Sequence, residues 1–391
     1  MLVNKLQLSL VAILLLLLPF HTLLIVNIVD LPIINLWKEV IIFLLLGLFL
    51  LNFAITNKFD FVDLFLLSTV VYFIFISAFS FFSISSLYGL RNLTEPLLFL
   101  LVVRKIKISA RLFESLVKSL ILIAFFISLF GIFQCLYLGD QFLLNLGYSR
   151  GSNGMLHHSF YFAGGILQRN VATFSSPNDL GFFLVIIIVM LNYCKLFKRK
   201  SVLWLINFVL YLSLFLTFSR SAMLGLCLYF VFNDFKKGLK IIGLIVIVFT
   251  LVNFLFPDLL LTISRFLSLT ISGKDPSIKG HLDSLLFSFD LVKENFIFGL
   301  EMGRVGPKAS MYFNTLIDVE SSFFCLFLDV GFIGFLLYII SFIPLMSNKL
   351  VLLLLLSVFP ALFLLPMIYE LEVMIVLYGL IGLISIKKNE E

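Results

Sequence analysis

Residues 201–235 of this chain read SVLWLINFVLYLSLFLTFSRSAMLGLCLYFVFNDF. As a single α-helix this stretch would extend about 52 Å, whereas the hydrocarbon core of a bilayer is only about 30 Å thick. Basic clusters lie on both sides of it, at 195–200 and at 236–240. Cytoplasmic loops carry the excess of Lys and Arg in membrane proteins, so both clusters are cytoplasmic only if the stretch crosses twice. The sequence therefore predicts a hairpin that turns at 219–221.

The rest of the chain has the composition of a polytopic membrane protein. Its 391 residues are 61% hydrophobic and 13% charged, and their mean hydropathy of +1.15 excludes an ordinary soluble domain. Apolar runs of spanning length lie at 6–29, 33–56, 61–82, 87–103, 112–138, 174–194, 201–217, 221–235, 239–256, 320–343, 349–366 and 368–386. The predicted fold is all-α, a polytopic membrane protein with about 12 transmembrane helices and a large outer-face loop between spans 9 and 10.

These runs divide the chain into five parts. The predicted parts are 1–138 for transmembrane spans 1–5, 139–173 for a first outer-face loop, 174–256 for spans 6–9, 257–319 for the large outer-face loop and 320–391 for spans 10–12. Within the large loop, apolar residues recur every three or four positions from Leu282 to Val292. This spacing predicts an amphipathic helix that lies on the membrane as a cap. With the N-terminus inside, every dense basic cluster is cytoplasmic, and so are both termini.

Arginine and lysine are distributed differently across this topology. Lysines divide thirteen inside to five outside, as the positive-inside rule requires, whereas arginines divide three inside to six outside. The outer arginines are Arg91, Arg150, Arg169, Arg220, Arg265 and Arg304. Because the planar guanidinium is permanently charged and suits two-pronged contact with phosphate, the inversion predicts an anionic ligand on the outer face.

Four stretches carry a resemblance to a known family. They are RNVATFSSPNDLG at Arg169–Gly181, TFSRSA at Thr217–Ala222, ENFIFG at Glu294–Gly299 and DVGFIG at Asp329–Gly334. In this order they resemble the motifs of bacterial O-antigen polymerases and O-antigen ligases. The resemblance covers about residues 165–340, and the N-terminal third adds only its string of spans.

The resemblance implies a location, a reaction and partners. The location is the bacterial cytoplasmic (inner) membrane, crossed many times. On its outer face, a glycan linked to undecaprenyl pyrophosphate is transferred to an acceptor hydroxyl without a metal or another cofactor. Polymerases join lipid-linked oligosaccharide repeat units into O-antigen or capsular polysaccharide. Membrane lipid surrounds the protein, a chain-length regulator protein is a candidate partner, and no nucleic acid is involved.

Three alternatives to a polymerase stay open. A ligase would transfer the glycan to lipid A core or protein, but ligases of the family carry a His-Asn pair before the tenth span, where this chain has Asp318-Val319-Glu320. A flippase or exporter of lipid-linked oligosaccharide would line a central path with charges at mid-membrane depth, whereas charges here gather at outer ends and in two loops. A scaffold or chain-length partner would leave the loop arginines without a purpose. The missing His-Asn pair, the outer position of the charges and the loop arginines together favour a polymerase.

The leaving pyrophosphate gains negative charge in the transition state, and arginines are the expected groups to stabilise that charge. The candidate catalytic residues are Arg220, in a turn too short to reach bulk water, and Glu320, which takes the position of the family's histidine as general base. The candidates for binding pyrophosphate or glycan are Arg169, Arg304, Arg265, Arg91 and His281. No metal site is expected, since no Asp-x-Asp loop or His/Cys ligand set is present.

Most of these residues also have a structural interpretation. Arg220 and Arg265 would serve equally as interfacial anchors for lipid headgroups, and Glu320 would serve as an acid at a helix start, stabilised by the helix dipole. His281 begins the amphipathic helix, where a capping role is common. Arg91 lies four residues before Glu95, a spacing that predicts an ion pair on one helix face.

Overall fold

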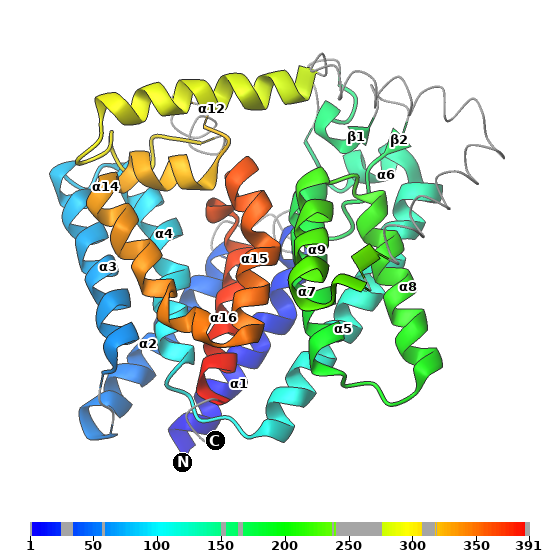
Figure 1. Ribbon diagram of the computed structural model, residues 1–391, viewed down its shortest axis with the longest axis horizontal. Helices are drawn as coiled ribbons and strands as arrows, with labels where there is room; N and C mark the ends of the chain where they lie inside the picture. Colours follow the sequence, from blue (N-terminus) through cyan, green and yellow to red (C-terminus); the bar gives the residue numbers. More distant parts are fainter. Residues whose placement is uncertain are drawn as a thin grey trace.

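The computed structural model describes residues 2–24, 34–56, 59–149, 154–162, 167–236, 238–239, 276–306, 317 and 319–387. These residues form a bundle of helices with one small two-stranded sheet (Figure 1). Six of the helices described are at least 18 residues long and apolar enough to cross a membrane, and four shorter apolar helices accompany them. The predicted α-helical membrane class is therefore confirmed, while the predicted total of twelve spans exceeds these six candidates.

The bundle helices pack side by side, and helices that follow each other directly along the chain run in opposite directions (Figure 1). They are α1 (Leu2–Leu17), α2 (Trp37–Thr56), α3 (Phe61–Phe79), α4 (Ile84–Val103), α5 (Ala110–Phe133), α7 (Pro177–Cys194), α8 (Lys200–Leu216), α9 (Arg220–Asn233), α14 (Ser322–Phe342), α15 (Lys349–Leu364) and α16 (Leu371–Lys387). Both chain termini lie at one end of the bundle, called here the terminal end. Helix α12 (Pro276–Glu294) lies across the opposite end, called here the capped end.

Helix α12 contains the predicted amphipathic helix, which the structure confirms at Leu282–Val292. Its orientation is nearly perpendicular to the bundle helices (Figure 1). The Ser284 hydroxyl accepts a hydrogen bond from the Glu320 backbone N–H at 3.2 Å, which ties α12 to the start of α14. The predicted span at 239–256, apart from Leu239, and residues 257–275, 307–316 and 318 of the predicted loop lie outside the described residues.

The first predicted outer-face loop, 139–173, has regular structure of its own at the capped end. Helix α5 continues through a π-helical turn (Gln134–Leu138) into the short helix α6 (Gly139–Asn145). After the 3-10 turn η5 (His158–Phe160), strand β1 (Tyr161–Phe162) pairs antiparallel with β2 (Leu167–Gln168). The all-α expectation did not include this sheet, which has only two residues in each strand.

A glycine-lined contact joins the two later motifs of the family resemblance. Gly331 has a positive φ of 67° that breaks α14, and a Cβ there would overlap the Ile297 carbonyl oxygen. The Phe332 N–H donates to the Phe296 carbonyl at 3.0 Å, and the Leu300 N–H donates to the Leu328 carbonyl at 2.6 Å. The stretches ENFIFG and DVGFIG therefore form one backbone contact that only glycine permits.

Replacing Gly331 with alanine is expected to destabilise the fold by about 3 kcal/mol, because the new Cβ adds left-handed strain to a backbone overlap. The measurement is the thermal unfolding temperature of the purified protein in detergent. Gly47→Ala in α2 is the matched control, since nothing lies within 4 Å of a Cβ added there. Equal unfolding temperatures for the two variants would contradict the close contact.

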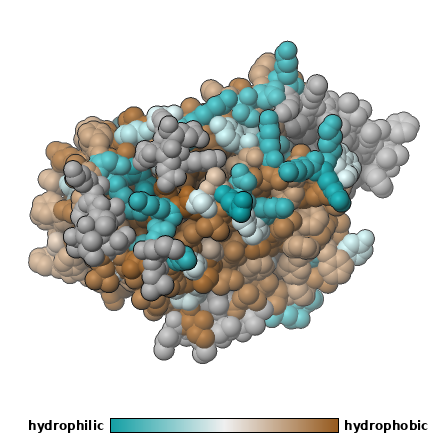
Figure 2. Space-filling model, turned by 90° about the horizontal axis from the view of Figure 1, so that it is seen from below, coloured by the Kyte–Doolittle hydropathy of each residue, from teal (hydrophilic) through white to brown (hydrophobic). Residues whose placement is uncertain are grey.

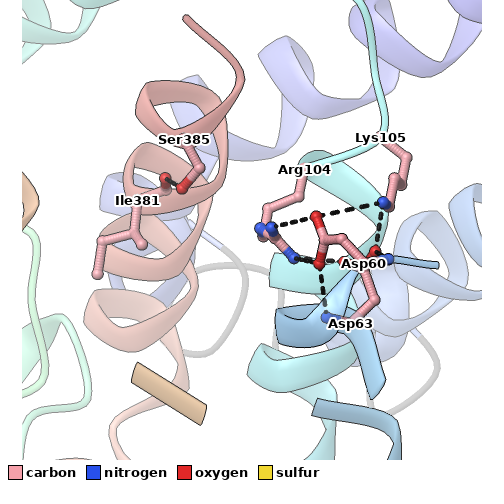
Figure 3. A network of polar contacts seen from close by, with 6 residues as sticks. All are labelled: Asp60, Asp63, Arg104, Lys105, Ile381 and Ser385. Atoms are coloured by element: carbon pink, nitrogen blue, oxygen red, sulfur yellow. Dashed lines mark hydrogen bonds and ion pairs between the residues drawn. The ribbon is translucent and has the colours of Figure 1, made fainter. Parts of the chain in front are cut away.

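An ion-pair network holds the terminal ends of α3 and α4 together (Figure 3). Asp60 caps the N-terminus of α3, and its side chain and that of Asp63 bond reciprocally to each other's backbone N–H. Arg104 pairs with Asp60 at 2.9 Å and with fully buried Asp63, and Lys105 also pairs with both. Burial alone would raise the pKa of Asp60, but the backbone bond from Asp63 and the Arg104 guanidinium lower it to about 2.

Hydrophilic side chains gather over the terminal end, with hydrophobic residues around them (Figure 2). This distribution agrees with a polar face at one edge of an apolar belt. The basic pair Arg104-Lys105, predicted on sequence to mark the cytoplasmic side, is partly neutralised here by the two aspartates.

Arg104→Ala is expected to lower the free energy of unfolding by about 3 kcal/mol, since it leaves the buried Asp63 carboxylate short of one partner. The folded pKa of Asp60, about 2, lies below its ordinary 3.8. Its contribution is therefore complete above pH 4 and is lost as the pH falls towards 2. Thermal unfolding between pH 7 and pH 2 measures both effects. Arg111→Ala, at an exposed site on the same end, should leave the curve unchanged; a similar loss there would refute the network's role.

Candidate functional site

Arg169 lies at the centre of the polar contacts at the capped end. It follows β2, and its guanidinium donates three hydrogen bonds to neutral acceptors. The acceptors are the Thr217 carbonyl at 2.7 Å, the Ser159 carbonyl at 2.9 Å and the Asn178 side-chain oxygen at 2.9 Å. One side chain thus joins η5, the start of α7 and the turn between α8 and α9.

The predicted hairpin is present, but its turn lies at 217–219, two residues before the predicted 219–221, between the end of α8 at Leu216 and the start of α9 at Arg220. Phe218 in this turn has a φ of 48°, an unfavourable left-handed conformation for a non-glycine residue. Its ring stacks on Phe162 of β1 at a centroid distance of 4.4 Å. The strained turn is therefore held from two sides, by this stacking and by the bond from Arg169, as strain at functional sites commonly is.

Close packing on α7 fixes the start of α9. A Cβ added at Gly181 would lie 3.0 Å from the Ala222 Cβ and 3.1 Å from the Ser219 Cβ. These residues belong to two motifs of the family resemblance, RNVATFSSPNDLG and TFSRSA, so the motifs meet in space. Helix α7 itself begins with Ser176 as N-cap and Pro177 in its first turn, a common helix start.

Arg220 is exposed in the first turn of α9 and lies close enough to Arg169 to repel it. Burial and this repulsion lower the pKa of Arg169 to about 10, while nearby Asp179 opposes the change. Arg169 thus stays charged at neutral pH. Two guanidinium groups beside a helix N-terminus, whose dipole is positive, form a place suited to a phosphate group.

Arg91 is held by carboxylates instead of by neutral groups. It forms ion pairs with Glu39 of α2 and with Glu95, and its Nε lies 3.7 Å from the Glu95 Oε2. The predicted i,i+4 pair is therefore confirmed. Lys38 joins the same group through Glu39 at 3.3 Å and through the His21 ring nitrogen at 3.2 Å.

Arg304 lies in a turn that packs on the capped end of α4. Its side chain is 54% exposed and pairs with Glu301, which in turn accepts a hydrogen bond from the Ser83 hydroxyl at 2.9 Å. The turn is fixed by a second bond, from the Gly303 N–H to the buried Asp329 carboxylate at 2.9 Å, and Tyr369 donates to the same carboxylate. Arg304 thus stays accessible on a rigid backbone.

The remaining predicted residues are placed less fully. Glu320 precedes Ser321, the N-cap residue of α14, and is half-buried, which is compatible with either predicted role. Arg265, Arg150 and the side chain of His281 lie outside the described residues. Over the ranges that the structure covers, no group of three or more His, Cys, Asp or Glu side chains is arranged to hold a metal ion.

The structure also assembles residues that the sequence analysis did not select. Lys38, Glu39 and His21 join Arg91 across a separation of more than fifty residues, which no local pattern signals. The one signal in the sequence is the charged pair Lys38-Glu39 directly before an apolar run, which indicates a charge close to a buried segment. The role of Arg169 in holding the turn is likewise a product of tertiary contacts.

The sequence matches no model of a known protein family, and a search of curated proteins finds no match either. The fold and the site define a helical membrane protein with a positively charged site at one end of its bundle. The resemblance to O-antigen polymerases and ligases rests on the quoted motifs.

Proposed function

We propose that this protein is a membrane-embedded glycosyltransferase that polymerises undecaprenyl-pyrophosphate-linked oligosaccharide repeat units into O-antigen or capsular polysaccharide. The observation that carries the proposal is that both arginines lie at the turn between α8 and α9, Arg169 through its bond to the Thr217 carbonyl and Arg220 as the first residue of α9. The motifs of the family resemblance support it, since the two that contain these arginines pack against each other.

In the proposed topology, the capped end faces outward and both termini are cytoplasmic. Each of the predicted runs other than 239–256 coincides with one of the bundle helices, which supports twelve spans. Helix α9 ends at the terminal end and α12 lies across the capped end (Figure 1), so a ninth span between them fits the order of the chain.

The proposed reaction joins two lipid-linked glycans. An acceptor hydroxyl attacks C1 of the donor glycan, the bond from C1 to the pyrophosphate oxygen breaks, and undecaprenyl pyrophosphate leaves with the electron pair. Arg220 contacts the pyrophosphate and stabilises its developing charge. Arg169 positions the turn that carries Arg220, through its bond to Thr217.

An apolar groove between α8 and α9 supports a lipid-linked substrate. Its volume is about 440 Å³, and its lining runs from Leu214 and Phe215 near the turn, through Met223, to Phe230 and Phe235 near the terminal end. An isoprenoid chain seated there would lie against hydrocarbon side chains along its length. Its pyrophosphate would then reach the turn at Arg220.

A reconstituted reaction tests the proposal. The purified protein in lipid nanodiscs is incubated with synthetic undecaprenyl-pyrophosphate-linked repeat units, and the products are separated by length. Dimers and longer chains support a polymerase. Transfer only after lipid A core or an acceptor protein is added would indicate the ligase alternative. Unchanged substrate that crosses the bilayer of a liposome would indicate the flippase or exporter.

A further inference from the structure

A compact group of charged side chains joins the segment after α1, the start of α2 and the middle of α4. We call it the acid–base cluster, and it consists of His21, Lys38, Glu39, Arg91 and Glu95. Lys38 is 5% exposed, and Glu39 and Glu95 are each 7% exposed. Arg91 is more accessible, with 37% of its side chain exposed, so it is the member of the cluster that a ligand contacts first.

Several buried polar atoms in this cluster lack a hydrogen-bond partner among the described residues. They include both carboxylate oxygens of Glu95, one oxygen of Glu39 and the amide nitrogen of neighbouring Asn92, which is 2% exposed. A buried group without a partner costs about 1–3 kcal/mol, and more when it is charged. A ligand that forms the missing hydrogen bonds would explain why buried groups without partners are present here.

The unfilled positions indicate the chemistry of that ligand. Three of these four atoms are carboxylate oxygens, so they need donors. A sugar hydroxyl can donate a hydrogen bond to one of these carboxylate oxygens. Its own oxygen can accept a hydrogen bond from the Asn92 amide or the Arg91 guanidinium. A glycan therefore fits this cluster better than an anion does, since Glu39 and Glu95 already offset Arg91 and Lys38.

A short segment connects the cluster to the arginine pair. The Thr173 hydroxyl donates to the Pro19 carbonyl, and the Leu23 N–H donates to the Thr173 carbonyl at 3.3 Å. His21 lies between these two contacts and bonds to Trp37 at 2.9 Å and to Lys38 at 3.2 Å. Thr173 comes four residues after Arg169, so one hydrogen-bonded segment links the cluster to the arginine pair.

We propose that the acid–base cluster binds the acceptor sugar and that Glu95 is the general base, an inference that rests on the proposed polymerase function. The acceptor hydroxyl donates to Glu95 and passes it a proton as its oxygen bonds to C1 of the donor. The electron pair of the broken bond leaves on undecaprenyl pyrophosphate, and water later removes the proton from Glu95. Glu95 is preferred to Glu39 because Glu39 contacts both Arg91 and Lys38 closely, whereas Glu95 has one ion pair at 3.7 Å.

A purely structural ion network is the competing explanation, and it predicts the opposite effect on stability. Glu95→Gln removes a buried, poorly paired charge but keeps the size of the side chain. If Glu95 serves catalysis, the unfolding temperature should stay equal or rise. If Glu95 serves mainly to hold Arg91, the unfolding temperature should fall, because a buried charge loses its partner.

The test uses the full chain in nanodiscs with the synthetic lipid-linked repeat unit. Glu95→Gln is expected to slow chain growth at least about 100-fold, the usual contribution of a general base, with no loss in unfolding temperature. Added formate, a small carboxylate, is expected to restore part of the activity of Glu95→Ala. Glu114→Gln, the same chemical change at an exposed site on the terminal end, should keep the full rate.

Glu95→Gln activity within threefold of the unaltered protein would overturn the inference, and so would a lowered unfolding temperature or a formate response that is absent. These outcomes are separable from failure of the proposed function. If the unaltered protein makes no polymer, the polymerase itself is refuted. If it makes polymer, requires Arg220 and does not require Glu95, only the role of Glu95 is refuted.

Discussion

Arg220→Ala is expected to lower the rate of chain growth about 10³-fold, because it removes the most accessible positive charge at the start of α9. The protein should still fold and insert, since Arg220 is exposed and the buried contacts of the turn are made by Thr217 and Ser219. Product length after incubation with lipid-linked repeat units measures the rate, and gel filtration in detergent measures folding.

Two comparisons make this result specific to the position of the charge. Arg199→Ala removes an exposed arginine at the opposite end of α8 and should leave chain growth unchanged. Arg220→Lys keeps the charge but offers a single point of contact in place of a fork, so it should retain more activity than alanine and less than arginine. A full ladder of chain lengths from Arg220→Ala would remove the residue from the proposed mechanism.

The sequence predicted the helical elements well because hydrophobicity determines them. The hairpin is present with its turn within two residues of the predicted 219–221, and the amphipathic helix from Leu282 to Val292 and the Arg91–Glu95 pair lie as expected. Each depends on residues no more than four positions apart, or on the length of an apolar run. Physical constraints of this kind act locally and can be read from one sequence.

What the sequence could not predict depends on contacts between distant segments. Tyr161 of β1 pairs with Gln168 of β2, and two residues in each strand are too few for a recognisable alternation of polar and apolar residues. The ion pair between Glu39 and Arg91 joins α2 to α4, and nothing in either helix's own sequence indicates that the two helices are in contact. Arg169 was selected for its charge, whereas its three neutral partners give it a positioning role that is set by the tertiary fold.

Arg169→Lys is expected to reduce chain growth about 100-fold even though the charge is kept, because one ammonium group cannot replace a planar fork that reaches three acceptors. The released turn at Phe218 would relax from its left-handed conformation, and Arg220 would move with it. The free energy of unfolding should fall by about 1–2 kcal/mol for Arg169→Lys and by about 3–5 kcal/mol for Arg169→Ala, which leaves the acceptors without any donor.

The contrast between the two arginines is the decisive measurement. Lysine should preserve activity better at position 220, where charge is the requirement, than at position 169, where three hydrogen bonds fix the Thr217 carbonyl, the Ser159 carbonyl and Asn178. Asn178→Ala removes one of these acceptors and should cause a smaller loss than Arg169→Lys. If Arg169→Lys grows chains at the full rate with an unchanged unfolding temperature, Arg169 does not position the turn, and the positive site must depend on Arg220 alone.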